Sequence, residues 1–274
     1  MNVASWFNDP FPIRTRCRNI IQRYGLGSYS FRLSIGAVDR PNYAFLVYQA
    51  AQLSARLGHP RVSILEFGVA GGNGLLALEY HAEEIEKLFP VKIDIYGFDT
   101  GKGLPEPLDY RDLEYHWKPN FFKMDVPGLE ARLKRAKLVL GDVRETVSKF
   151  FKEHNPAPVG AVSMDLDFYS STATALKLFD ADPIHFLPRA VVYFDDTIGD
   201  QKELYGDFTG QRLAIHEFNR NRDKAKLSPI YYLLASPGAP GWHHQMWSLH
   251  LFDHVDYNKF ISEDNQQLPL VAPA

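Results

Sequence analysis

The sequence predicts an α/β fold with a doubly wound sheet of seven strands, five of them parallel and the last two forming an antiparallel hairpin. Short apolar runs alternate with helical patterns from residue 61 to 195, which is typical of parallel strands joined by right-handed βαβ crossovers. Beyond residue 222, two apolar runs have a connection too short for a crossover helix, so they are expected to pair antiparallel. The 274 residues are enough to bury a sizeable core.

The elements of this fold follow in order along the chain. A helix is expected over residues 41–58, with Pro41 in its first turn and Gly58 as its stop. Parallel strands then alternate with helices: strands at 61–67, 92–98, 137–140, 160–165 and 189–195, and helices near 74–88, 127–136, 143–153 and 171–180. A helix near 202–222 precedes the hairpin, whose strands are expected at 228–235 and 245–252.

The chain divides into an N-terminal segment and one α/β domain. Residues 1–40 are expected to be helical and to form either a cap over a ligand site or an arm in a dimer. Residues 41–274 form the domain, with an insertion at about 103–126 after the second strand. The insertion is long and charged, which predicts a lid. Its aromatic side chains either stack on a ligand or pack against the body: Tyr110, Tyr115, His116, Trp117, Phe121 and Phe122.

Composition and charge exclude several classes of protein. The net charge of −3 gives no indication of a nucleic-acid or membrane partner, and no run of about 18 apolar residues occurs. The arginines near Cys17 are interpreted as a solvated face. Cys17 is the single cysteine, so no intrachain disulfide can form, which suits a reducing compartment. A cytoplasmic protein is therefore expected, acting on a small molecule, either as a monomer or as a homo-oligomer.

A glycine-rich stretch, "ILEFGVAGGNG" at 64–74, directly follows the first predicted strand. Glycines there let backbone N–H groups approach a ligand at the start of a helix. Within it, "GNGLLA" fits the dinucleotide pattern G-x-G-x-x-G/A, which keeps a nicotinamide-dependent oxidoreductase as an alternative. Its first glycine, however, lies five residues past the strand rather than in the tight turn that this pattern requires.

The spacing Glu66-x-Gly68-x-x-Gly71-Gly72-x-Gly74 resembles motif I of the class I S-adenosylmethionine-dependent methyltransferases. The resemblance implies that this loop wraps the methionine part of the cofactor, that Asp99 holds the ribose, and that the segment after the third strand contacts adenine. It implies these cofactor-binding residues: Glu66, Gly68, Ala70, Gly72, Asn73, Asp99, Thr100, Gly141, Asp142, Val143 and Asp165. A non-catalytic S-adenosylmethionine-binding protein remains an alternative.

Four further motifs narrow the resemblance. "FGVAGGNG", "GFDTGKGLPEP", "DLDFYSST" and "FDD" are together similar to the macrocin O-methyltransferase-like family, and more distantly to the caffeoyl-coenzyme A O-methyltransferases, over residues 40–255. The resemblance implies a Rossmann-like fold and O-methylation of a sugar or catechol-like hydroxyl in a small natural product. It also implies a divalent cation, usually Mg²⁺, held by Asp165, Asp195 and Asp196.

The positions of these acids agree with a cation site. All three are expected at the carboxyl ends of neighbouring strands, where open α/β sheets bind ligands, and oxygen ligands suit a hard cation. The alternative is that the aspartates cap the next helix or face water, and Asp167 is interpreted as such a solvated acid. Asp165 is also taken as catalytic. Candidate bases are His243 and His244 in the hairpin loop, and Lys102, although a metal-activated hydroxyl needs none.

Overall fold

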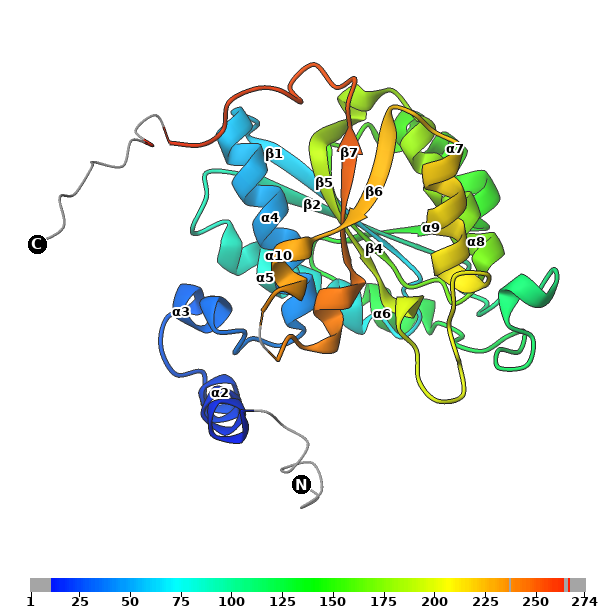
Figure 1. Ribbon diagram of the computed structural model, residues 1–274, viewed down its shortest axis with the longest axis horizontal. Helices are drawn as coiled ribbons and strands as arrows, with labels where there is room; N and C mark the ends of the chain where they lie inside the picture. Colours follow the sequence, from blue (N-terminus) through cyan, green and yellow to red (C-terminus); the bar gives the residue numbers. More distant parts are fainter. Residues whose placement is uncertain (1–10, 237, 264–265, 267–274) are drawn as a thin grey trace, which may run out of the picture.

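A seven-stranded sheet lies at the centre of the protein, in the order β3-β2-β1-β4-β5-β7-β6 (Figure 1). The computed structural model describes residues 11–236, 238–263 and 266. Strands β1 to β5 pair in parallel, and β7 is antiparallel to both β5 and β6. The predicted topology is therefore confirmed. The strands are β1 Arg61–Phe67, β2 Lys92–Asp99, β3 Lys137–Leu140, β4 Val159–Met164, β5 Phe186–Phe194, β6 Ala225–Pro229 and β7 Met246–Leu251.

Helices cover both faces of the sheet. In Figure 1, α4 (Pro41–Leu57) and α5 (Asn73–Ile85) lie on one side, and α7 (Val143–His154), α8 (Tyr169–Ala175) and α9 (Gly210–Arg220) on the other. Each side has its own apolar core, because successive strand residues point to opposite faces. With both faces covered, the central parallel strands are buried along nearly their whole length, as β1 and β4 illustrate.

The hairpin differs from the sequence prediction. Its first strand is β6 at Ala225–Pro229, whereas residues 231–234 form the short helix α10 (Tyr231–Leu234). β6 is the edge strand, where Pro229 costs no ladder hydrogen bond, and the chain leaves the sheet after it. The connection to β7 is accordingly longer than expected and includes the 3₁₀ helix η5 (Gly241–Gln245).

Three predicted helices are shorter in the structure. The helix expected near 127–136 is α6 (Val126–Glu130), and the one expected near 202–222 begins only at Gly210. The helix expected near 171–180 continues after α8 as the 3₁₀ helix η2 (Leu176–Asp180). Further 3₁₀ turns are η1 (Tyr110–Asp112), η3 (Pro183–His185) and η4 (Asp195–Thr197). The helix at 41–58 is confirmed, with Gly58 in the left-handed conformation at its end.

The N-terminal segment contains the helices α2 (Pro12–Tyr24) and α3 (Tyr29–Ser34); residues 1–10 of the predicted cap lie outside the described residues. None of the side chains described in α2 is buried, and in Figure 1 this helix stands apart from the sheet. By contrast, α3 docks on α5: the Tyr29 hydroxyl lies 2.9 Å from Nδ1 of His81, and Nε2 of His81 lies 2.8 Å from the Asp39 carbonyl oxygen.

His81 makes this contact pH-dependent. Burial lowers the pKa of its imidazole to about 4, from an ordinary 6.5. Protonation of His81 therefore favours the unfolded chain. Its contribution to the unfolding free energy is complete above about pH 6.5 and is lost as the pH falls toward 4. Between pH 7 and pH 5 the wild type should lose about 2 kcal/mol of unfolding free energy relative to His81→Leu. Urea titrations at several pH values measure this, and equal pH profiles would contradict it.

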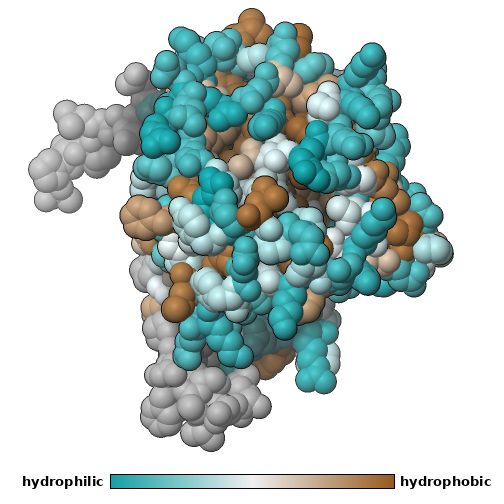
Figure 2. Space-filling model, turned by 90° about the vertical axis from the view of Figure 1, so that its right-hand side faces the viewer, coloured by the Kyte–Doolittle hydropathy of each residue, from teal (hydrophilic) through white to brown (hydrophobic). Residues whose placement is uncertain are grey.

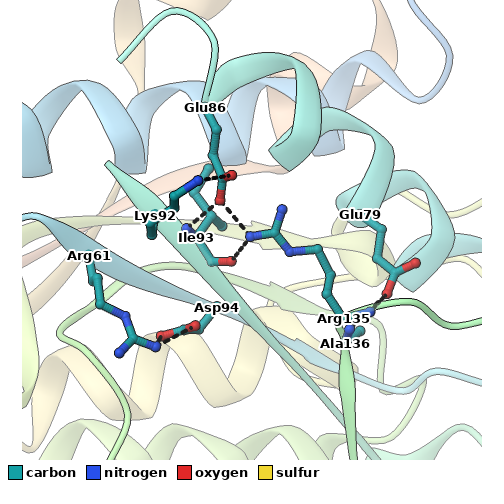
Figure 3. Close-up of polar contacts among 8 residues, drawn as sticks. All are labelled: Arg61, Glu79, Glu86, Lys92, Ile93, Asp94, Arg135 and Ala136. Atoms are coloured by element: carbon teal, nitrogen blue, oxygen red, sulfur yellow. Dashed lines mark hydrogen bonds and ion pairs between the residues drawn. The ribbon is translucent and has the colours of Figure 1, made fainter. Parts of the chain in front are cut away.

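Polar contacts connect α5, β1 and β2 to the segment before the edge strand β3 (Figure 3). Glu79 on α5 accepts hydrogen bonds from the backbone N–H groups of residues 134, 135 and 136, just before β3. Glu86 accepts from Arg135 at 2.5 Å and from the Ile93 N–H at 2.8 Å. Asp94 pairs with Arg61 at 2.8 Å. Asp94 therefore joins the starts of β1 and β2 through an ion pair.

One face of the surface shows how polar and apolar side chains are distributed. Figure 2 shows a mostly hydrophilic face in which hydrophobic residues form small separate patches. Cys17 is exposed. Among the residues that the structure describes, no helix is both long enough and apolar enough to span a membrane.

Candidate active site

A cavity of about 750 Å³ opens at the carboxyl ends of β1 to β5. This is the edge at which open α/β sheets bind their ligands. Eight of the predicted cofactor-binding residues line it: Gly68, Ala70, Asp99, Thr100, Gly141, Asp142, Val143 and Asp165. The three motifs, far apart in the sequence, therefore converge on one cavity.

The loop after β1 is held by tight backbone contacts. Gly68 has a φ of +82°, and a Cβ atom there would lie 1.7 Å from the backbone oxygen of Asp165. Only glycine tolerates both the conformation and the contact. The Oδ2 atom of Asp99 accepts hydrogen bonds from the N–H groups of Val69 and Ala70, at 2.9 and 3.0 Å. Asp99 therefore fixes this loop relative to β2.

Glu66, Gly72 and Asn73 are not among the described residues that line the cavity. Glu66 is buried beneath the loop, where the Tyr43 hydroxyl donates to its Oε1 at 2.6 Å and its Oε2 has no partner. Burial raises the pKa of Glu66 to about 8. A Cβ atom at Gly74 would lie 1.8 Å from Glu66 Oε1, so the start of α5 packs directly on this carboxyl group. The arrangement indicates that Glu66 supports the loop from below.

The segment after β3 forms another wall. The Asp142 carboxylate caps α7 by accepting from the Arg144 N–H at 2.8 Å, and it pairs with the Arg144 guanidinium. That arginine lowers the pKa of Asp142. Arg144 itself lines the cavity, together with Val143. The sequence prediction missed Arg144, although its position two residues after a helix-capping aspartate is the signal that could have identified it.

Three carboxylates meet beside the cofactor loop. Asp165, Asp195 and Asp196 each offer an oxygen atom, and these atoms lie within 4.8 Å of one another. Asp165 follows β4, and the other two follow β5. Burial and repulsion by neighbouring acids raise the pKa values of Asp165 and Asp196 well above the ordinary range. The structure thus brings together the residues that the resemblance implies for a cation.

Neighbouring side chains fix the orientation of this cluster. Gln211 on α9 is fully buried; its Oε1 accepts from the Asp196 N–H at 2.8 Å and its Nε2 donates to the Met164 carbonyl at 3.0 Å. The hydroxyl groups of Tyr205 and Tyr193 donate to Asp196 and Asp195. Asp196 Oδ2 remains buried without a partner. The sequence prediction missed Gln211, although a glutamine on the apolar face of an amphipathic helix is a detectable signal.

Asp167 is buried, so its interpretation as a solvated acid was wrong. It lines the cavity and has a φ of +24°, which is unusual for a residue with a side chain. Burial, followed by repulsion from Asp195 and Glu203, raises the pKa of Asp167 to about 7. Asp167 therefore adds a further carboxyl group to the acidic lining of this cavity.

The candidate bases lie elsewhere. His243 belongs to η5, where its Nδ1 lies 2.9 Å from the Leu233 carbonyl oxygen, and burial lowers its pKa. His244 is exposed. Lys102 is also exposed, and its backbone N–H donates to Thr100 Oγ1 at 3.0 Å. None of the three is among the described residues that line the cavity.

The insertion at 103–126 forms the outer wall. Leu104, Leu108, Trp117 and Phe122 line the cavity, whereas Tyr110 and Tyr115 are mostly exposed. Asp112 is fully buried and anchors the insertion to α8, because its carboxylate accepts from the N–H and the hydroxyl of Ser170, both at 2.8 Å. Across the opening, Glu203 pairs with His116 at 3.6 Å.

Sheet order and cavity define the class of fold. The dinucleotide-binding fold has strand order 3-2-1-4-5-6. Here an antiparallel β7 lies between β5 and β6, which does not match the oxidoreductase alternative. The chain has instead the Rossmann-like fold of methyltransferases.

Comparisons with known proteins agree with this class. No family model matches the chain, and no curated protein sequence matches it. Among solved structures, the calicheamicin methyltransferase CalS11 aligns with a TM-score of 0.50 and 20% identity, over 89% of this chain and 93% of that one. The O-methyltransferase NovP aligns with a TM-score of 0.48 and 13% identity, over 66% and 72% of the two chains. TomG from Streptomyces achromogenes, an O-methyltransferase of tomaymycin synthesis, aligns with a TM-score of 0.41 and 16% identity, over 86% of this chain and 87% of that one.

Proposed function

We propose that this protein is an S-adenosylmethionine-dependent O-methyltransferase that acts on a hydroxyl group of a small molecule. The observation that carries the proposal is the convergence of three cofactor-motif segments on one cavity that also contains a carboxylate cluster. A sensor of the cofactor needs the loop but gains nothing from acids placed beside it. The domain at 41–274, with a lid at about 103–126, is part of this proposal.

The residues present fit the cofactor. Gly68 and Ala70 line the cavity next to Asp99, and the cavity volume is within the usual range for ligand sites. Bound S-adenosylmethionine supplies an electrophilic methyl group. Asp99 accepts from the N–H groups of Val69 and Ala70 through Oδ2 and from that of Gly101 through Oδ1, which leaves one lone pair on Oδ1 for a ribose hydroxyl. Val143 offers an apolar contact to a base ring, and Thr100 a polar one near Asp99.

The same cavity fits a divalent cation. Asp165, Asp195 and Asp196 would hold it, since three oxygen donors from carboxylates suit Mg²⁺ and the buried Asp196 Oδ2 has no other partner. A bound cation would neutralise the cluster and lower the pKa of an acceptor hydroxyl. Gln211, Tyr193 and Tyr205 keep the carboxylates oriented before any ligand arrives. The histidines of η5 are not needed for this arrangement.

The acceptor class follows from the lid and the resemblance. Trp117 and Phe122 offer aromatic surface, and Glu106 and Glu203 offer acceptors for hydroxyl groups. This mixture suits a sugar or a catechol-like ring. The macrocin-like resemblance supports the same class of acceptor, as does the fold shared with a calicheamicin methyltransferase.

Methyl transfer from isotopically labelled S-adenosylmethionine to a panel of sugars, sugar nucleotides and catechols tests the proposal. The expected result is a methylated product, identified by mass, with a matching release of S-adenosylhomocysteine that stops in chelator. Full turnover in chelator would remove the cation from the proposal but leave the transferase. Failure to bind the cofactor would overturn the proposal as a whole.

A further inference from the structure

A second cavity, of about 410 Å³, lies on the α4 side of the sheet. Its floor is formed by β5, β7 and β6, through residues that include Arg189, Ser248 and Ser228, and α4 contributes Gln52 and Arg56 to its wall. None of its lining residues also lines the larger cavity. The proposed methyl transfer therefore assigns no role to this space.

The lining combines apolar side chains with two cationic ones. Arg56 and Arg189 both line it, with glutamine, serine and histidine side chains beside them, and no aspartate or glutamate is among the described lining residues. Sheet floors are usually apolar where a helix packs on them, so this stretch departs from the pattern. Among the polar side-chain atoms of the described lining, Nη2 of Arg189 is the one that is buried without a hydrogen-bond partner, and such an atom indicates a missing ligand or water.

Arg189 gives the strongest evidence that this cavity binds an anion. Its Nη1 donates to the Tyr257 carbonyl at 2.6 Å, and its guanidinium lies 5.3 Å from the centre of the Tyr257 ring. Its Nη2 is buried and has no hydrogen-bond partner. No carboxylate of the described chain forms an ion pair with Arg189. An unpaired and partly desolvated guanidinium is costly unless an anion accepts from it.

The side chains near Arg189 form neutral hydrogen bonds with one another. His250 Nδ1 lies 2.8 Å from the Tyr257 hydroxyl, and His250 Nε2 lies 2.9 Å from Ser248 Oγ. Burial, followed by the charge of Arg189, lowers the pKa of His250, so the imidazole adds no charge at neutral pH. Arg56 reaches the same space from α4, with one nitrogen bound to the Ile261 carbonyl at 2.8 Å. The two guanidiniums are thus the charges that a ligand would meet.

We propose that this cavity binds a small anionic molecule through a carboxylate or phosphate group held by Arg189 and Arg56. A guanidinium pairs with either group through parallel N–H donors, and Ser248 and Gln52 add neutral ones. Ile230 and Tyr231, which also line the cavity, face the less polar part of the ligand. The site is separate from the cofactor cavity and does not depend on the function proposed above.

Calorimetric titration of the intact protein with phenyl phosphate, benzoate and inorganic phosphate tests this site. Gln52 and Arg56 lie outside the larger cavity, so substitutions at these positions separate binding here from binding there. Gln52→Glu places a carboxylate beside the two arginines, and Gln22→Glu makes the same change on α2 as a matched control. We expect saturable binding of at least one probe, weakened at least tenfold by Gln52→Glu and unchanged by Gln22→Glu. Higher salt should weaken binding further.

The three probes distinguish a phosphate ligand from a carboxylate ligand. Tighter binding of phenyl phosphate than of benzoate identifies a phosphate ligand, and the reverse order identifies a carboxylate. Arg56→Gln, at an exposed position, gives the same readout if Gln52→Glu does not fold. Binding that is equal in wild type and in the folded cavity variants would overturn the proposal, as would the absence of saturable binding for all three probes.

Discussion

Replacing Asp196 with asparagine should abolish cation binding and, at the same time, make the metal-free protein more stable. The side chain is buried, its Oδ2 has no partner, and burial together with neighbouring acids raises its pKa well above the ordinary range. The amide keeps the shape and cannot ionise, so it removes the free-energy cost that this crowded, buried carboxyl group imposes on folding at neutral pH. Methyl transfer should fall by roughly 100-fold or more, since even changes to residues that only orient metal ligands cost about 10–100-fold.

Thermal unfolding with Mg²⁺ and with chelator measures both effects. The wild type should gain stability on adding Mg²⁺, and Asp196→Asn should start from an equal or higher melting temperature but gain none. Asp223→Asn is the control, because Asp223 is exposed and lies outside both cavities. An Asp196→Asn protein that still responds to Mg²⁺ as the wild type does would show that these carboxylates have a structural role only.

Substituting Gly68 with alanine should strongly weaken cofactor binding, because the new side chain would collide with the backbone of Asp165. The new Cβ would lie 1.7 Å from the Asp165 carbonyl oxygen, at a φ of +82°. Backbone atoms cannot move aside as a flexible side chain can, so the loop and the end of β4 must separate. We expect affinity for S-adenosylhomocysteine to fall by about 100-fold, which corresponds to about 2.7 kcal/mol, together with a lower stability.

Gly71→Ala is the matched control in the same loop. A Cβ atom at Gly71 meets only a side-chain nitrogen at 4.0 Å, so alanine fits without strain. Its cofactor affinity should equal that of the wild type. The explanation fails if the two alanine variants bind equally, because the contact with Asp165 and the left-handed backbone at Gly68 are the differences invoked. Calorimetry on both variants, with the fold checked by circular dichroism, gives the comparison.

The predictions from sequence succeeded where a local pattern determines the structure. The apolar run of β1 and the positions of Pro41 and Gly58 depend on neighbours in the sequence, so the strand and the helix limits were correct. The hairpin failed at residues 231–234, because the apolar segment beyond Pro229 fits a strand or a helix equally well. The choice between strand and helix depends on the position of β6 at the edge of the sheet, which local sequence does not indicate.

The site was predictable in its motifs but not in its supporting residues. Asp99, Asp165, Asp195 and Asp196 follow strands, so the parallel topology alone brings them to one edge. Gln211 reaches the same place from α9, and no rule of spacing indicates which helix residue will bridge two strands. Contacts of this kind depend on tertiary packing. The burial of Glu66 beneath the loop was missed for the same reason.

Calorimetric titration of S-adenosylhomocysteine into the purified protein is the most direct test of the central claim. The expected result is saturable binding at one site per chain, retained in Gly71→Ala and lost in Gly68→Ala. The absence of binding by a folded wild-type protein would contradict the claim that the cavity at the carboxyl ends of β1 to β5 holds the methyl donor.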